Sequence, residues 1–159
     1  MKAVRGMVLG KFLPPHAGHL HLVDFAQNWV DELTIVVGTL AGEAIDGALR
    51  HRWMEELCPG ASVVHLTDEN PQHPSEHPDC WATWEASLRR ILPDPVDLVF
   101  ASEPNGQRVA EILGARFIPV DPGRLAQDVS GTAIREDPFG HWEFLPPPGG
   151  SNRRIQPPE

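Results

Sequence analysis

Positive charge is scarce in this sequence. Its 159 residues include 13 lysines and arginines against 22 aspartates and glutamates, so the formal net charge is -9 when the histidines are neutral. A surface with this charge repels polyanions, and duplex DNA or RNA is therefore not expected as a partner. A small anion is a different case, because it needs only a local positive pocket.

Cysteine and long apolar runs are also scarce. The two cysteines, Cys58 and Cys80, form no C-x-x-C pair, and the N-terminus lacks the apolar stretch of a secretory signal. No apolar run approaches the roughly 18 residues that a membrane span needs. We therefore expect a reduced, cytoplasmic protein.

The length fits a single domain, which we place at residues 1–146. Residues 147–159 are rich in Pro, Gly and polar side chains and cannot form a core, so we expect this tail to be disordered.

Apolar segments alternate with helical patterns along the chain. In residues 18–30 the apolar side chains, Leu22, Ala26 and Trp29 among them, recur every three or four positions, as in an amphipathic helix. A strand, a helix and a second strand in succession form a right-handed crossover, which indicates a parallel sheet. The expected strands are 4–9, 33–37, 61–66, 96–100 and 116–120, and the expected helices 18–30, 47–57, 80–92 and 109–113. This pattern predicts an α/β fold, a doubly wound sheet of about five parallel strands.

The stretch 10–19 joins the first strand to the first helix and has the features of a phosphate site. A helix N-terminus offers unpaired backbone N–H groups and partial positive charge. His16 and His19 lie three residues apart, on one face of the first helical turn, and Lys11 adds an ammonium group. No acidic residue lies in this stretch to compete with an anion.

A second phosphate site is indicated at residues 130–135. Ser130 is a good N-cap, and Thr132 and Arg135 share one face of the short helix that it starts. A hydroxyl and a guanidinium at a helix N-terminus suit phosphate oxygens. A plain capped surface turn is the alternative.

Both stretches resemble signatures of one enzyme superfamily. Residues 10–19 match G-[KR]-F-x-P-x-H-x-G-H of the HxGH nucleotidyltransferases, and residues 130–135 match their S-x-T-x-I-R signature. The chain is most similar to the adenylyltransferase domain of the bifunctional NMN adenylyltransferase/ribosylnicotinamide kinase family, over about residues 5–146. This resemblance implies a Rossmann-like sheet in the order 3-2-1-4-5. It also implies transfer of AMP from ATP to nicotinamide mononucleotide (NMN), giving NAD and pyrophosphate.

The resemblance also assigns roles to residues. It implies that the catalytic groups are His16, His19, Lys11 and Arg135. The implied ATP-binding residues are Gly10, Phe12, Gly18, Ser102, Ser130, Thr132 and Arg135. The implied NMN-binding residues are Gly38, Arg50 and Trp81. In the related enzymes the arginine at the position of Arg50 binds phosphate, and Trp81 best matches a tryptophan that stacks on the nicotinamide ring.

No protein metal site is expected. His73, His77 and Cys80 lie close together in a polar segment, but structural zinc needs four ligands and no second pair is visible. We expect Mg²⁺ to arrive with ATP, held mostly by phosphates and water.

The sequence departs from the bifunctional relatives in one respect. It has no G-x-x-x-x-G-K-[ST] motif, so we expect no ribosylnicotinamide kinase activity, and too few residues precede the first strand for a helix-turn-helix domain. Two alternatives remain at this level. One is transfer to another acceptor, such as nicotinate mononucleotide, pantetheine phosphate, FMN or a CTP-dependent alcohol phosphate. The other is a nucleotide-sensing module without catalysis.

Overall fold

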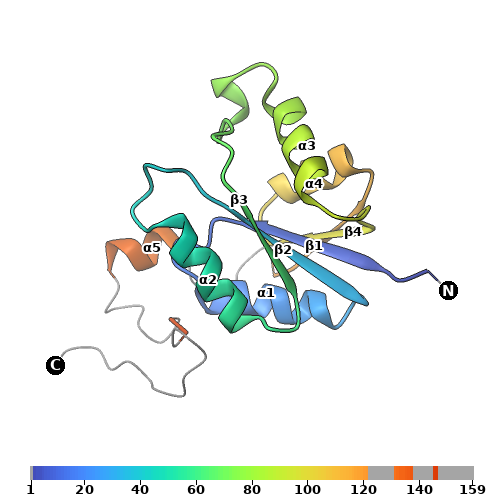
Figure 1. Ribbon diagram of the computed structural model, residues 1–159, viewed down its shortest axis with the longest axis horizontal. Coiled ribbons are helices and arrows are strands. Elements are labelled where there is room, and N and C mark those ends of the chain that lie inside the picture. The colour runs from blue at the N-terminus through green and yellow to red at the C-terminus, as the bar shows by residue number, and fades with distance from the viewer. Residues whose placement is uncertain (1, 122–130, 138–144, 147–159) are drawn as a thin grey trace.

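Strand β1 (Arg5–Gly10) lies at the centre of a five-stranded parallel sheet (Figure 1). The computed structural model describes residues 2–121, 131–137 and 145–146. The strand order is β3-β2-β1-β4-β5, as predicted. The other strands are β2 (Glu32–Gly38), β3 (Ser62–Leu66), β4 (Leu98–Ala101) and β5 (Arg116–Pro119).

Helices cover both faces of the sheet. Helices α1 (Ala17–Gln27) and α2 (Gly47–Leu57) lie on one face, and α3 (Cys80–Ile91) and α4 (Asn105–Leu113) lie on the other (Figure 1). A 3₁₀ turn, η1 (Pro74–Glu76), precedes α3, and α5 (Gly131–Glu136) is the last described helix. This arrangement is the doubly wound α/β fold that the alternating pattern predicts.

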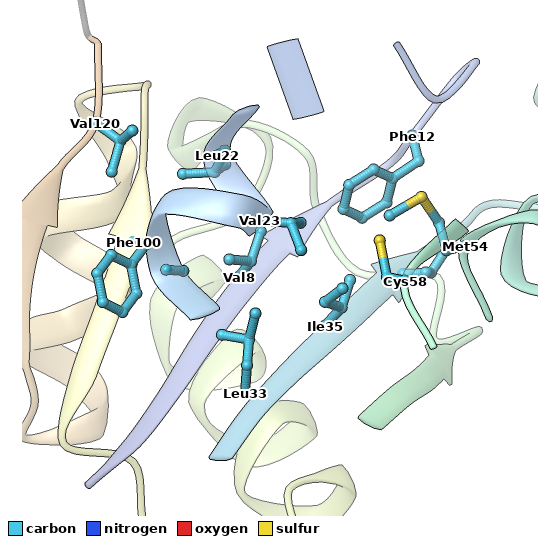
Figure 2. Packing of buried hydrophobic residues seen from close by; sticks show 12 residues of the cluster. Val8, Phe12, Leu22, Val23, Leu33, Ile35, Met54, Cys58, Phe100 and Val120 are labelled. Carbon is cyan, nitrogen blue, oxygen red and sulfur yellow. The ribbon is translucent and has the colours of Figure 1, made fainter. Parts of the chain in front are cut away.

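The core has two halves because side chains alternate along β1. Val8 packs on the α1 side with Val23, Ile35 and Phe100 (Figure 2), whereas Met7 packs on the α3 side with residues such as Leu88. Both β1 side chains are at most 1% exposed. A strand that is buried on both faces reads as a continuous apolar run, which is why β1 was visible in the sequence.

Helix α4 lies unusually close to the sheet. A Cβ atom on Gly106 would come within 2.6 Å of the side chains of Ala101 and Phe117, so only glycine fits there without a shift. The helix begins at Asn105, four residues before the predicted start, and ends at Leu113. Gly114 caps it with a φ of 68°, the left-handed conformation typical of a helix C-terminus. The predicted stop is confirmed.

One expected core residue is on the surface. Helix α1 ends at Gln27, because Asn28 closes it with a backbone N–H bond to the Asp24 carbonyl, at 3.3 Å. The predicted continuation to residue 30 is therefore wrong. Trp29 lies past the helix end, 56% exposed, with its ring stacked on Phe25 at a centroid distance of 5.6 Å.

Some predictions fall on residues that the structure does not describe, namely the role of Ser130 and the tail 147–159. In the part of the chain that it does describe, no helix combines the length and apolar character of a membrane span.

Candidate active site

The two histidines of the first signature cap helix α1 together. His16 is the N-cap residue, and its Nδ1 accepts the N–H of Gly18 at 3.1 Å. His19 reaches back, and its Nδ1 accepts the N–H of His16, also at 3.1 Å. An imidazole that accepts at Nδ1 carries its proton at Nε2. Backbone geometry therefore makes both Nε2 atoms hydrogen-bond donors.

The turn between β1 and α1 is shaped by Phe12. This residue has a φ of 50°, an uncommon value for a side chain of its size, and is 1% exposed. Its ring packs edge-on against His19, at a centroid distance of 4.7 Å. A Cβ atom on Gly10 would lie 3.1 Å from the same ring. Phe12 thus holds the turn beneath the histidine pair.

A cavity of about 690 Å³ opens in front of this turn, at the carboxyl ends of β1 and β4. That volume is within the range of small-molecule sites. The cavity gathers nine of the predicted residues from both signatures and the β4–α4 segment: Gly10, Lys11, Phe12, His16, Gly18, His19, Ser102, Thr132 and Arg135. Residues that are far apart in the chain therefore form one site, as the topology of a parallel sheet requires.

The second signature is tied to the first by a direct contact. Nη1 of Arg135 donates a hydrogen bond to the carbonyl oxygen of Leu13, in the first signature, and Nη2 donates to Oγ1 of Thr132 at 3.3 Å. In the β4–α4 segment, the Ser102 hydroxyl donates to the carbonyl oxygen of Val120 at 2.6 Å, so it faces the chain beyond β5.

A second, smaller pocket adjoins the cavity on the other side of the turn. Its volume is about 80 Å³, and it shares Leu9, Gly10 and Lys11 with the large cavity. The rest of its lining comes from the ends of β2 and β3 and from α3, and includes Gly38, Asp68, Gln72 and Trp84.

The tryptophan in this pocket is Trp84, not Trp81. The indole N–H of Trp84 donates to the carbonyl oxygen of Pro71 at 2.8 Å, which holds the ring beside the strand ends. Both tryptophans pack at the margin of the α3-side core, but Trp81 lines neither of the two cavities. The Arg108 guanidinium lies 5.9 Å from the Trp81 ring centroid. The sequence predicted the helix but not its rotation about its own axis.

Arg50 lies beneath the turn rather than on its surface. Its side chain is 0% exposed, Nη1 donates to the carbonyl oxygen of Lys11 at 2.9 Å, and Nη2 donates to Oε1 of Glu43 at 2.9 Å. The fully buried residues of α2 are Arg50 and Met54. Arg52 is exposed.

Glu43 is the functional candidate that the sequence analysis missed. Its carboxylate accepts from Lys11, Arg50 and the backbone N–H of Leu40, at 2.8 Å for the last. Burial alone would raise the pKa of Glu43, but these hydrogen bonds outweigh it and lower the pKa to about 2. The only sequence signal was an acidic residue in the loop after a strand end.

Residues suited to metal ligation do not gather anywhere in the described chain. No group of three or more His, Cys, Asp or Glu side chains within it is arranged to hold an ion. His73 and His77 each accept a nearby backbone N–H instead, from Ser75 and Asp79.

Sequence relatives identify the family of this chain. No model of a known protein family matches the chain. It is, however, 31% identical to the nicotinamide-nucleotide adenylyltransferase of Methanocorpusculum labreanum over 154 residues, which cover 90% of this chain and 85% of the relative. The chain belongs to the nicotinamide-nucleotide adenylyltransferase family. The enzyme of the same name from Methanoculleus marisnigri is 29% identical over 91% of this chain and 86% of its own length.

A longer relative contains this domain as one part. The trifunctional NAD biosynthesis/regulator protein NadR of Escherichia coli K12 is 30% identical over 163 residues. The match covers 91% of this chain but 39% of NadR, so the chain spans about two fifths of that relative.

Solved structures share the fold of this chain. A crystal structure of NadR protein in complex with NR superposes with a TM-score of 0.67 at 21% identity, over 89% of this chain and 43% of that one. The bifunctional NMN adenylyltransferase/ADP ribose pyrophosphatase of Francisella tularensis, complexed with AMP and a Mn ion, gives 0.63 at 14% identity, over 87% and 42% of the two chains.

Proposed function

We propose that this protein transfers AMP from ATP to NMN, giving NAD and pyrophosphate. The observation that carries the proposal is the junction of the two pockets at Gly10 and Lys11. The large cavity has the size and the cationic side chains for a nucleoside triphosphate, and the small pocket has an aromatic wall for a flat ring. Two substrates bound in this way meet over the phosphate turn.

ATP would lie in the large cavity with its triphosphate over the N-terminus of α1. The Nε2–H groups of His16 and His19 can donate to the phosphates that become pyrophosphate, because both Nδ1 atoms accept from backbone N–H groups. Lys11 and Arg135 line the same space and add positive charge. Ser102 and the residues that follow it would face the adenosine.

The reaction follows from this placement. An oxygen of the acceptor phosphate attacks the α-phosphorus of ATP, a P–O bond forms, and the bond from the α-phosphorus to the bridging oxygen breaks as pyrophosphate leaves. The acceptor phosphate is already ionised near neutral pH and needs no general base. Positioning and charge stabilisation supply the rate, as in other phosphoryl transfers. Mg²⁺ enters as part of the MgATP substrate, and it neutralises phosphate charge.

NMN would place its pyridine ring against Trp84 in the small pocket. Asp68 lines the same pocket, and Arg90 binds its carboxylate at 2.7 and 2.8 Å and, with Ser87, lowers its pKa. A carboxylate can accept a hydrogen bond from the amide of nicotinamide, whereas it repels the carboxylate of nicotinate. Asp68 lines the pocket whereas Arg90 does not, so the acidic member of this ion pair faces the ring and favours NMN over the nicotinate mononucleotide.

The test is an assay with a panel of acceptors. Purified protein with MgATP is incubated with NMN, nicotinate mononucleotide, pantetheine phosphate or FMN, and pyrophosphate and product mass are measured. We expect pyrophosphate and NAD with NMN, at a rate well above that of the other acceptors. A faster reaction with another acceptor would reassign the substrate, and no pyrophosphate with any of them would indicate a binding module.

The stereochemistry of the transfer tests the mechanism. ATP that is chirally labelled at the α-phosphorus should give inversion at that centre in the dinucleotide. Retention, or exchange of pyrophosphate into ATP without an acceptor, would reveal an adenylylated enzyme.

A further inference from the structure

The Glu43 carboxylate lies in a site built for an anion. One of its oxygens accepts from Nη2 of Arg50 at 2.9 Å and from the N–H of Leu40 at 2.8 Å, and the other accepts from Nζ of Lys11. Two cations and a backbone N–H that converge on one point form the donor set with which proteins bind phosphate. The Glu43 side chain is 11% exposed, so it fills this site.

This anion site lies where the two proposed substrates meet. Lys11 lines both the large cavity and the small pocket, Glu43 lines the large cavity, and Leu40 lines the small pocket. An acceptor whose ring rests on Trp84 and whose phosphate attacks ATP must carry that phosphate across this junction. The Glu43 carboxylate therefore lies on the path of the acceptor phosphate.

Arg50 has more donors than Glu43 uses. Its Nε is fully buried and has no hydrogen-bond acceptor among the described residues. A buried N–H without a partner is costly, and a carboxylate offers only two oxygens to the converging donors. A phosphate monoester offers three terminal oxygens, one more than the carboxylate, to the same group of donors.

We propose that the Glu43 carboxylate occupies the binding site of the acceptor phosphate as an internal mimic of phosphate, and that the incoming phosphate must displace it. Glu43 then sets the affinity for the acceptor. That the acceptor is NMN rests on the function proposed above, whereas displacement by a phosphate does not.

The exchange needs only a side-chain movement. The loop that carries Glu43 is anchored by backbone groups, with the Thr39 N–H bonded to the Leu66 carbonyl at 2.9 Å and the Ala41 N–H bonded to Glu69 at 3.2 Å. Because the pKa of Glu43 is about 2, the carboxylate does not leave by taking up a proton near neutral pH. A competing anion is required.

The test is to neutralise Glu43 and measure phosphate binding directly. Glu43→Gln keeps the size of the side chain but removes the competing charge, so the phosphate site is open in a larger fraction of the molecules. If the phosphate site is open in about a tenth of the molecules, the apparent affinity for phosphate is about tenfold lower than that of the open site. We therefore expect Glu43→Gln to bind inorganic phosphate and NMN about tenfold more tightly, measured by titration calorimetry without ATP.

Glu69→Gln is the matched control. It removes the same charge from a carboxylate that also binds this loop, but among the described residues Glu69 forms no hydrogen bond or ion pair with Lys11 or Arg50, and it is exposed. It should leave both affinities within about twofold. Equal tightening in the two variants would indicate a general effect of net charge and overturn the proposal.

Two further results would also overturn it. Weaker phosphate binding in Glu43→Gln would mean that Glu43 only positions Arg50 and Lys11. Unchanged phosphate affinity in Glu43→Gln, or no phosphate binding by either the wild type or the variant, would mean that the group of Lys11, Arg50 and Leu40 donors is not a phosphate site.

A measurement on the unmodified protein covers the case in which Glu43→Gln does not fold. The carboxyl carbon of Glu43 and the amide of Leu40 can be followed by NMR during titration with phosphate. Displacement predicts that both signals shift along the binding curve, whereas saturation with the Glu43 signal unmoved overturns it. If phosphate shifts both signals but NMN neither binds nor consumes ATP, the proposed function fails and the displacement stands.

Discussion

His16 and His19 hold each other in place through the backbone of one helix turn. Each ring accepts a backbone N–H at Nδ1, and the two rings are stacked with their centroids 3.6 Å apart. The same arrangement therefore caps helix α1 and presents the two Nε2–H groups as donors. Any substitution that removes the ring also removes the cap, unless the new residue can cap the helix itself.

His16→Asn separates these two roles. Asparagine is among the best N-cap residues, so we expect the thermal stability to change little, whereas His16→Ala should cost about 1 kcal/mol. Both variants lose the Nε2–H donor, and kcat should fall about 10²- to 10³-fold with a small change in KM for ATP. Thermal melts and steady-state rates with MgATP and NMN measure the two effects. A kcat loss below tenfold in His16→Asn would exclude His16 from the chemistry.

Trp84 and Trp81 form a matched pair on helix α3. Trp84→Ala should weaken the binding of NMN by about 1 to 2 kcal/mol, the order of a stacking contribution, which is measured as a higher KM for NMN. The KM for ATP should be nearly unchanged. Both rings pack at the margin of the core, so both variants should lower stability, but Trp81→Ala should have no selective effect on NMN. If Trp81→Ala gave the selective loss and Trp84→Ala did not, the small pocket would not be the pyridine site.

Asp68→Asn tests the selectivity between NMN, which carries an amide on its ring, and nicotinate mononucleotide, which carries a carboxylate. Removing the carboxylate from the small pocket should lower the preference for NMN over nicotinate mononucleotide about tenfold, because like charges at close range oppose binding. The ratio of kcat/KM for the two acceptors is the measurement. Glu69→Gln, one position along the chain, neutralises an exposed carboxylate and should leave the ratio unchanged.

The folded protein should lose stability in acid partly through Glu43. Its pKa falls from an ordinary 4.5 to about 2 on folding, so its contribution to stability is full above pH 4.5 and is lost as the pH falls toward 2. The linked free energy is about 3 kcal/mol. Unfolding by urea at several pH values should show the wild type more stable than Glu43→Gln near pH 6, with the difference shrinking below pH 4.5. A difference that does not vary with pH would argue against this pKa.

Much of the site could be predicted because parallel strands bring their carboxyl ends together. Gly10, Ser102 and Arg135 come from distant parts of the chain, yet they line one cavity, as the βα alternation and the two signatures together indicated. One wrong prediction concerns a helix end. Trp29 continues the apolar helical pattern of α1, but the helix ends before it and its side chain is on the surface.

The sequence by itself determined the features that depend on neighbours in the chain. The reciprocal cap of His16 and His19 spans three residues, and the stop at Gly114 needs only a residue that tolerates positive φ. The five-strand alternation is likewise a local pattern repeated along the chain. These features need no knowledge of what packs against them.

Only the tertiary structure decided which side chains share a pocket. Whether Trp81 or Trp84 reaches the strand ends depends on how α3 is rotated against the sheet. The union of Lys11, Glu43 and Arg50 depends on a loop conformation that brings residues 32 and 39 positions from Lys11 to one point. Such contacts follow from packing between distant segments, and the charge on Glu43 is stabilised only because two cations have been brought to it.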